Sequence, residues 1–150
     1  MSTTKLQPAL HWFRQRNWKP FPFQQEAWAA YLAGQSGLVN APTGSGKTYS
    51  LFFGPALEYL AEKSVAHLPG RPHLAKKTSR KKPPGIGLRV LWITPVRALA
   101  KEIQQSCQRA ADELGLDWEI AMRTGDTSAR ERTKQKKNAP QMLVTTPESL

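Results

Sequence analysis

The stretch APTGSGKT, residues 41–48, decides the fold that we expect for this chain. It follows the short apolar run 38–39 and precedes the run 49–53, so we expect a loop between a buried strand and a helix. Glycines, which have no Cβ, let such a loop turn tightly and point successive N–H groups inward at phosphate oxygens. The start of the helix adds unpaired amides and the positive end of its dipole. The stretch therefore predicts a phosphate-binding loop.

Two residues of this loop carry side chains suited to a triphosphate. Ala41 stands where the usual pattern has glycine, while the later glycines, Lys47 and Thr48 keep their spacing. Lys47 is expected to reach the β- and γ-phosphates as a point charge, and the Thr48 hydroxyl to ligate Mg²⁺. We name these two as candidate catalytic residues. The expected phosphate contacts are Thr43, Gly44, Ser45, Gly46, Lys47 and Thr48. The alternative is an ordinary glycine-rich turn between a strand and a helix.

The charge of the chain predicts a polyanionic partner. Its 150 residues include 22 Lys and Arg against 11 Asp and Glu, which gives a net charge of +11. Such a charge attracts nucleic acid or an anionic membrane. A membrane partner is the weaker prediction, because no apolar run approaches the roughly 20 residues of a spanning helix, and residues 1–13 lack the apolar core of a signal peptide. A single cysteine, Cys107, fits a reducing cytoplasm.

Residues 1–35 predict a helical segment that leads to the phosphate loop. The predicted elements are a short amphipathic helix carrying Leu6, Leu10, Phe13 and Trp18, closed by Asn17 and Pro20, and a helix from Phe23 to about Gly34 with Ala27, Trp28, Tyr31 and Leu32 on one face. Gln24 is thereby held at the start of the second helix. Its carboxamide can donate to and accept from an adenine edge at once, so ATP is the expected nucleotide. A merely solvated glutamine is the alternative.

Residues 36–150 predict strands alternating with helices. The helix after the phosphate loop is expected to run to about Lys63, with a kink or a break at Pro55. Residues 88–94 read as a central strand covered on both faces. The next helix is expected to end at Gly115, and its predicted core residues are Val96, Leu99, Ile103, Cys107, Ala110 and Leu114. Strands near 118–123 and 141–145 and a basic helix at 128–137 follow, which indicates an α/β fold with a mostly parallel sheet.

A basic, proline-rich segment interrupts this pattern at about 68–87. It has no acidic residue and few apolar ones, so we expect a mobile loop. Two interpretations stay open, sequence-independent contact with phosphates and a solvated insertion without a partner.

The turns that follow the predicted strands carry candidate nucleic-acid contacts. Arg97 lies just after the end of a strand, where open α/β sheets bind ligands, and its guanidinium can clamp a phosphate. It could instead cap or pair locally. Gly125 would let a nucleic-acid strand come close, and Thr127 offers a hydroxyl to a phosphate. Asp126 or Thr127 could also cap the basic helix. Pro147 is expected at a first helical position.

Five ordered stretches give this chain a family resemblance. PFPFQ, APTGSGKT, TPVRALA at 94–100, RTGDT at 123–127 and TTPESL at 145–150 resemble the motifs of superfamily 2 DEAD/DEXH-box helicases. The last two resemble most the large helicase-related (Lhr) branch, with its ligase-associated DNA-repair members. The resemblance implies an incomplete RecA-like domain, with Gln24 as the Q-motif glutamine and Thr43 to Thr48 as motif I. It also implies contacts with one nucleic-acid strand by Thr94, Pro95, Arg97, Gly125, Asp126, Thr127, Thr146, Pro147 and Glu148.

The resemblance also implies what the whole protein does. It would be an ATP-dependent 3′-to-5′ translocase that acts on DNA rather than RNA and works with repair proteins such as a ligase or nuclease. The chain stops at 150, before a DEXH aspartate and glutamate and before a second RecA-like domain. We therefore expect this part alone to bind weakly and not to hydrolyse ATP. The alternatives are another P-loop NTPase or kinase, and a non-catalytic nucleic-acid-binding module.

Overall fold

The computed structural model describes residues 3–66 and 87–150, and these form two compact units. The described part of the first unit comprises residues 3–66 together with Glu113–Leu116, and that of the second comprises residues 87–112 and 117–150. Each unit is described separately below. The basic segment expected at about 68–87 lies outside the described residues except for Gly87.

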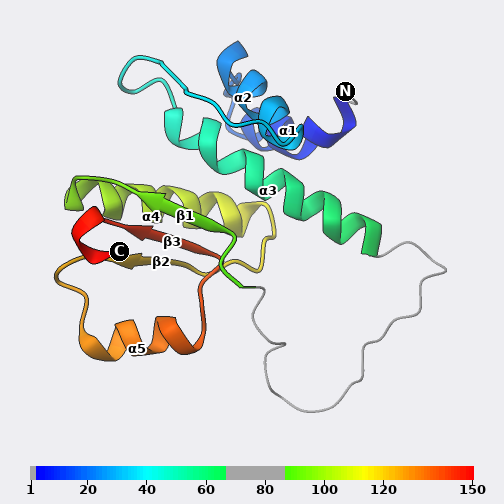
Figure 1. The fold of residues 1–150 in the computed structure, drawn as a ribbon. Coiled ribbons are helices and arrows are strands. Elements are labelled where there is room, and N and C mark those ends of the chain that lie inside the picture. Colours follow the sequence, from blue (N-terminus) through cyan, green and yellow to red (C-terminus); the bar gives the residue numbers. More distant parts are fainter. Residues whose placement is uncertain (1–2, 67–86) are drawn as a thin grey trace. The chain divides into compact units, whose positions relative to one another are not determined.

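The described part of the first unit is helical (Figure 1), and aromatic side chains form its core. Its elements are a short 3-10 helix η1 (Thr3–Leu6), α1 (Gln7–Gln15), α2 (Pro22–Leu32) and α3 (Lys47–Ala66). Trp12, Phe13, Trp28 and Phe53 are buried, and their rings meet at centroid distances of 5.1 to 5.8 Å, within the range of favourable aromatic pairs. Asn17 ends the α1 region with a φ of 56°, a conformation that asparagine tolerates. The predicted close of the first helix is therefore confirmed.

One expectation about the surroundings of the phosphate loop is wrong. Residues 38–39 do not form a strand, and Leu38 is 93% exposed. A strand needs a neighbour to receive its backbone hydrogen bonds, and the described residues of the first unit contain no strand that could be that neighbour. The helix α3 continues through Pro55, so of the predicted kink or break the structure excludes the break.

The second unit is built on a three-stranded parallel sheet in the order β1-β3-β2 (Figure 1). The strands are β1 (Val90–Ile93), β2 (Ile120–Arg123) and β3 (Met142–Thr145). Both outer strands pair with β3, all four of whose residues are buried. The α/β prediction with a parallel sheet is confirmed. The expectation that 88–94 forms a central strand is wrong, because β1 is an edge strand whose Leu91 and Ile93 are nearly half exposed.

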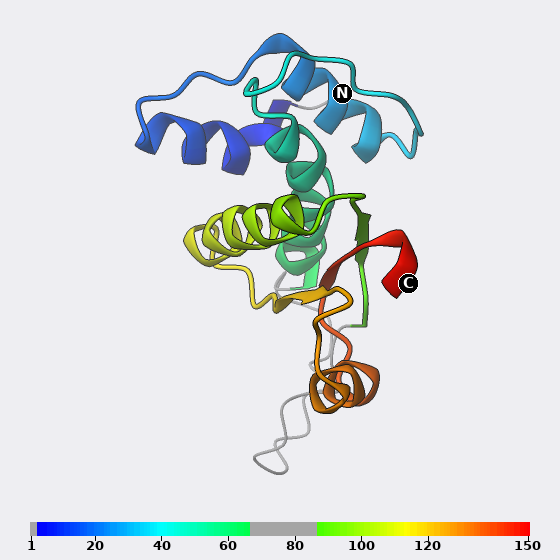
Figure 2. The same cartoon turned by 90° about the vertical axis from the view of Figure 1, so that its left-hand side faces the viewer.

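Two helices flank β2, and their glutamine side chains cover its outer edge. In both views β2 lies between α4 (Arg97–Glu113) and α5 (Ala129–Lys137) (Figures 1 and 2). Gln104 donates to the Ile120 carbonyl at 2.8 Å, and Gln108 accepts from the Ile120 amide at 2.9 Å. Gln135 of α5 donates to the Met122 carbonyl at 3.1 Å. These carboxamides take the place of a neighbouring strand, which protects an otherwise open edge.

The buried side of α4 differs in part from the predicted core. Ala100, Cys107, Ala110 and Ala111 are buried, whereas Val96 and Leu99 are nearly half exposed. The buried face of the helix therefore consists of small side chains. Gly115 follows the helix with a φ of 67°, which confirms the predicted stop.

No helix among residues 3–66 and 87–150 has the length and hydrophobicity that crossing a bilayer requires.

Candidate nucleotide and nucleic-acid sites

The phosphate loop turns at two glycines in the left-handed region. Gly44 has a φ of 79° and Gly46 a φ of 80°, values that favour glycine strongly. The amides of Gly44, Gly46, Lys47 and Thr48 form no hydrogen bond within the described residues, because α3 begins at Lys47 and the first amides of a helix have no intrahelical partner. Such unpaired amides at the positive end of a helix suit a phosphate group.

The charged side chain of the loop folds onto the loop itself. The Lys47 ammonium donates to the Ala41 carbonyl and, at 2.9 Å, to the Pro42 carbonyl. The Ser45 hydroxyl also donates to the Pro42 carbonyl, at 2.6 Å. These two carbonyls hold the ammonium near the start of α3. The Lys47 side chain can leave them to bind an anion there. Among the described residues the Thr48 hydroxyl forms no hydrogen bond, and a hydroxyl oxygen suits a cation as a ligand.

Gln24 is bound to the phosphate loop. The side chain is buried, at 2% exposure, so the alternative of a solvated glutamine is wrong. Its Oε1 accepts from the Phe21 amide at 2.8 Å, and its Nε2 donates to the Gly46 carbonyl at 3.0 Å. A carboxamide has two N–H donors and two oxygen lone pairs, so one donor and one acceptor stay available to a ligand. The residue therefore links the start of α2 to the phosphate loop.

The second unit gathers the other candidate residues at one end of its sheet. The three strands run parallel, so the segments after β1, β2 and β3 all leave at the same end. Thr94 continues the ladder by donating its amide to the Thr145 carbonyl at 2.9 Å. Pro95 follows Thr94, and Pro147 opens the short 3-10 helix η2 (Pro147–Ser149), as predicted for a first helical position.

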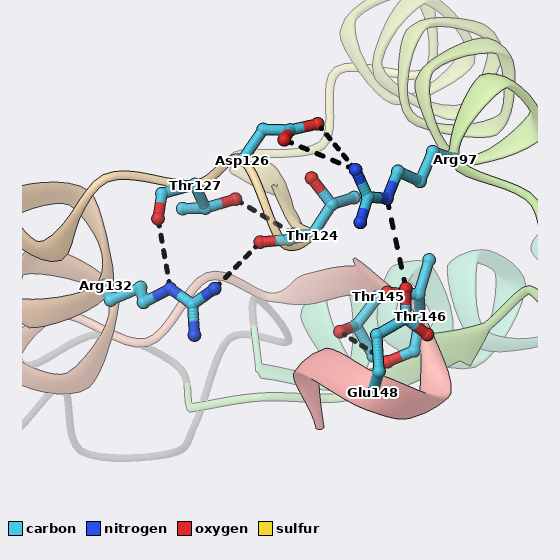
Figure 3. Close-up of polar contacts among 8 residues, drawn as sticks. All are labelled: Arg97, Thr124, Asp126, Thr127, Arg132, Thr145, Thr146 and Glu148. Carbon is cyan, nitrogen blue, oxygen red and sulfur yellow. Dashed lines mark hydrogen bonds and ion pairs between the residues drawn. The ribbon is translucent and has the colours of Figure 1, made fainter.

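Arg97 joins the turns after all three strands (Figure 3). Its Nη1 donates to both carboxylate oxygens of Asp126, at 3.2 and 3.3 Å, and its Nε lies 3.9 Å from Glu148 Oε1. A Cβ on Gly125 would lie 2.8 Å from Arg97 Nη2, so the guanidinium fills the space that this glycine leaves open. Arg97 is 55% exposed, so its ion pairs contribute no more than about 1 kcal/mol to stability. Its charge is held in place yet open to solvent.

The carboxyl of Glu148 has a lowered pKa. The main cause is a hydrogen bond with its own backbone amide, followed by the Thr146 hydroxyl and the charge of Arg97. Thr146 is fully buried, and its hydroxyl, although close enough to lower this pKa, forms no well-directed hydrogen bond. The hydroxyl of the preceding Thr145 donates to the Thr146 carbonyl at 3.3 Å. Glu148 therefore stays ionised and contributes to holding Arg97.

Thr127 closes the turn after β2 and does not cap the helix α5. Thr127 Oγ1 accepts from the Thr124 amide at 2.9 Å, which leaves the hydroxyl hydrogen free to donate. The expectation that Asp126 or Thr127 caps α5 is wrong, because Ser128 takes that position and accepts from the Glu131 amide at 3.2 Å. Asp126 is engaged with Arg97 instead.

Comparison with known proteins identifies the family. The sequence profile of the DEAD/DEAH box helicases matches residues 21–150, a range that includes both candidate sites. The chain belongs to the DEAD/DEAH box helicase family. Among solved structures, it resembles the Mycobacterium smegmatis helicase Lhr bound to ssDNA and AMP-PNP, with a TM-score of 0.63 and 30% identity over 95% of this chain and 17% of the other. The helicase MrfA bound to DNA and AMPPNP, at 21% identity and a TM-score of 0.69, supports the RecA-like fold alone.

Several curated relatives of this helicase-family chain are Lhr proteins. It is 34% identical over 149 residues to the Lhr helicase/uracil glycosylase of Escherichia coli, which covers 93% of this chain and 9% of the relative. It is 31% identical to the ATP-dependent helicase Lhr-Core protein 2 of Thermococcus barophilus, over 95% of this chain and 16% of the relative. The chain thus spans less than a fifth of the length of these relatives.

Sequence reasoning missed Arg132, which fixes the turn after β2 in this helicase-family chain. Its Nε donates to the Thr127 carbonyl at 3.0 Å, and its Nη2 donates to the Thr124 carbonyl at 2.9 Å (Figure 3). Nothing in the sequence separates Arg132 from its basic neighbours. The difference arises from the side of α5 that faces the turn, and this depends on how the helix packs.

Proposed function

We propose that this chain is the amino-terminal portion of an ATP-dependent DNA helicase or translocase. In this proposal the loop 41–48 binds the phosphates of ATP, and the segments after β1, β2 and β3 bind one strand of nucleic acid. The observation that carries the first half is the set of unpaired amides at the start of α3, beside a lysine and a hydroxyl. The observation that carries the second is Arg97, held by two carboxylates and exposed to solvent.

In the nucleotide site, each group has a distinct role in the proposal. The unpaired amides of Gly44, Gly46, Lys47 and Thr48 surround the phosphates. The Lys47 ammonium leaves its carbonyl partners to neutralise the terminal phosphates, and the Thr48 hydroxyl ligates Mg²⁺. Bound Mg²⁺ would neutralise phosphate charge. Gln24 binds adenine with its remaining donor and acceptor, while its other bonds keep it fixed to Gly46.

In the nucleic-acid site, the acidic residues act through Arg97. A carboxylate repels a phosphate, so Asp126 and Glu148 position the guanidinium and do not bind the backbone themselves. Arg97 and the Thr127 hydroxyl supply the donors for phosphate oxygens. We propose DNA over RNA because the related Lhr structure holds ssDNA.

Hydrolysis requires groups that these 150 residues do not contain. The sequence has no DEXH aspartate and glutamate to hold Mg²⁺ and orient water. We therefore propose that this chain by itself binds nucleotide without turnover. For the whole protein we propose ATP-driven movement along DNA in a reducing cytoplasm, in the company of repair proteins such as a ligase or nuclease.

A paired binding experiment tests both halves of this proposal. Lys47→Ala should weaken binding of a non-hydrolysable ATP analogue with Mg²⁺ and leave binding of single-stranded nucleic acid unchanged. Arg97→Ala should weaken binding of single-stranded nucleic acid and leave binding of the ATP analogue unchanged. Competition with GTP distinguishes the alternative of another P-loop NTPase, because Gln24 predicts a preference for adenine. Equal competition by GTP would contradict that preference. A chain that binds single strands but no nucleotide would be a non-catalytic nucleic-acid-binding module.

A further inference from the structure

The helix α5 is strongly basic, and most of its charge is not used by the strand-end site, which consists of Arg97 and the turns after β1, β2 and β3. Its nine residues include five cations and one carboxylate, that of Glu131. Gln135 is its only buried residue, and Glu131 and Arg132 are half-buried, so these three define the side that packs against the rest of the unit. The outward side carries four cations and no acid, and these are Arg130, Lys134, Lys136 and Lys137.

Three of the outward cations are free of acidic partners. Lys134 lies 3.7 Å from Glu119 and 3.9 Å from Glu131, which partly neutralise it. Arg130, Lys136 and Lys137 have no recorded carboxylate partner among residues 3–66 and 87–150. They are exposed, and Arg130 and Lys137 lie seven positions apart on the helix, which is about 10 Å along its axis. One strand of a B-form duplex presents about three phosphates over that length.

The helix is held rigidly to the strand-end site. Ser128 caps its first turn, and the two hydrogen bonds of Arg132 tie it to the carbonyls of Thr124 and Thr127. Gln135 also accepts from Arg123 Nε at 3.0 Å, which fixes the second half of the helix to β2. A basic face that is fixed in this way binds a polyanion at a lower entropic cost than mobile lysines do.

We propose that the outward face of α5, formed by Arg130, Lys136 and Lys137, is a second, sequence-independent contact for the phosphate backbone of nucleic acid. It continues the strand-end site, because α5 begins at Ala129, two residues after Thr127. The inference therefore rests on nucleic-acid binding at that site. The phosphates belong either to the same single strand or to an adjoining duplex. The chemistry is the same in both cases, and the experiment separates them.

The test measures how affinity depends on salt for two labelled probes, an oligothymidylate and the same oligothymidylate joined to a duplex. The variant replaces Arg130, Lys136 and Lys137 by Gln in the 150-residue chain, which keeps helix propensity. The matched control replaces one arginine and two lysines of the first unit, Arg14, Lys5 and Lys19, by Gln, which removes the same charge from other exposed positions. A further variant, with R130K, K136R and K137R, keeps the charge and shows whether altered side chains alone disturb binding.

The proposal predicts a shallower slope of log K against log salt for the α5 variant only. The decrease should be about 2 if single-strand phosphates are contacted and about 3 if duplex phosphates are. A change with both probes assigns the contact to the single strand, and a change with the tailed duplex alone assigns it to the duplex. A slope equal to that of the matched control with both probes overturns the proposal.

The Arg97→Ala variant separates this inference from the proposed function. If Arg97→Ala weakens binding and the α5 variant does not, the strand-end site stands and the second contact fails. If Arg97→Ala has no effect while the α5 variant flattens the slope, α5 contacts nucleic acid and the strand-end assignment fails.

Discussion

Adding a methyl group at each glycine of the phosphate loop tests whether Gln24 supports the loop. Gly44→Ala and Gly46→Ala place alanine at nearly the same φ, 79° and 80°. Each substitution should lower the free energy of unfolding by about 1 kcal/mol, because an L-residue is strained in the left-handed region. Around Gly44 a Cβ meets nothing within 4 Å, whereas at Gly46 it would lie 2.7 Å from Gln24 Nε2.

The difference between the two variants measures the Gln24 contact. Gln24 is buried, and the Phe21 amide also holds it, so its carboxamide cannot move aside freely. Gly46→Ala should therefore also disrupt the hydrogen bond from Gln24 to the Gly46 carbonyl. The loss of that bond should make Gly46→Ala about 1 kcal/mol more destabilising than Gly44→Ala.

Urea denaturation of four chains completes the cycle, with each glycine variant made alone and in a Gln24→Ala background. The free energy of unfolding of the two glycine variants should differ in the original background and coincide in the Gln24→Ala background. Equal effects of Gly44→Ala and Gly46→Ala in the original chain would refute the contact. A difference that persists without Gln24 would assign the effect to backbone strain instead.

Three further predictions concern the second unit. Ser128→Ala should lower the free energy of unfolding by about 1 kcal/mol, because α5 loses its cap. Thr133→Ala on the same helix is the control and should change the free energy of unfolding little. Equal urea midpoints for the two variants would contradict the cap. Burial raises the pKa of the Cys107 thiol to about 12, so a thiol reagent at pH 8 should react only after unfolding, and rapid reaction of the folded chain would contradict this burial. The pKa of the Glu148 carboxyl is lowered in the folded chain, so its contribution to stability is present above the unfolded pKa and is lost as the pH falls through the folded one. An NMR titration should place its midpoint below 4.5, and a midpoint at or above 4.5 would count against the hydrogen bond with its backbone amide.

The elements that were predicted correctly are those with strong local signals. The glycines of the loop, the stop at Gly115 and the close of the first helix at Asn17 follow from conformations that few residue types adopt. The parallel sheet follows from the alternation of apolar runs and amphipathic helices. Such signals lie within a few residues of each other, so a single sequence suffices to recognise them.

The incorrect predictions concern features that depend on neighbours. An apolar run such as 88–94 predicts a strand, but its place in the sheet depends on which other strands pair with it, and β3 takes the centre. The apolar run at 38–39 likewise predicted a strand, but no described strand of its unit pairs with it, and Leu38 is exposed. The support of the turn after β2 by Arg132 depends on the packing of α5, which local patterns do not specify.

For the candidate sites too, features with a local signal could be predicted and features that depend on distant residues could not. Lys47 and Thr48 could be named from spacing alone, since the loop chemistry is contained in eight consecutive residues. Arg97 could be named from its place after a strand. That Gly125 makes room for the Arg97 guanidinium could not be read from the sequence, because the two residues lie far apart in the chain.

An NMR titration tests the central claim most directly. The amides of Gly44, Gly46, Lys47 and Thr48 are unpaired at the start of α3, so a bound triphosphate should accept from them. Adding Mg²⁺ and a non-hydrolysable ATP analogue to the labelled 150-residue chain should shift these four amide signals together, and Lys47→Ala should greatly reduce the shifts at the same ligand concentration. Signals at 44–48 that stay in place while other parts of the chain respond would contradict the account.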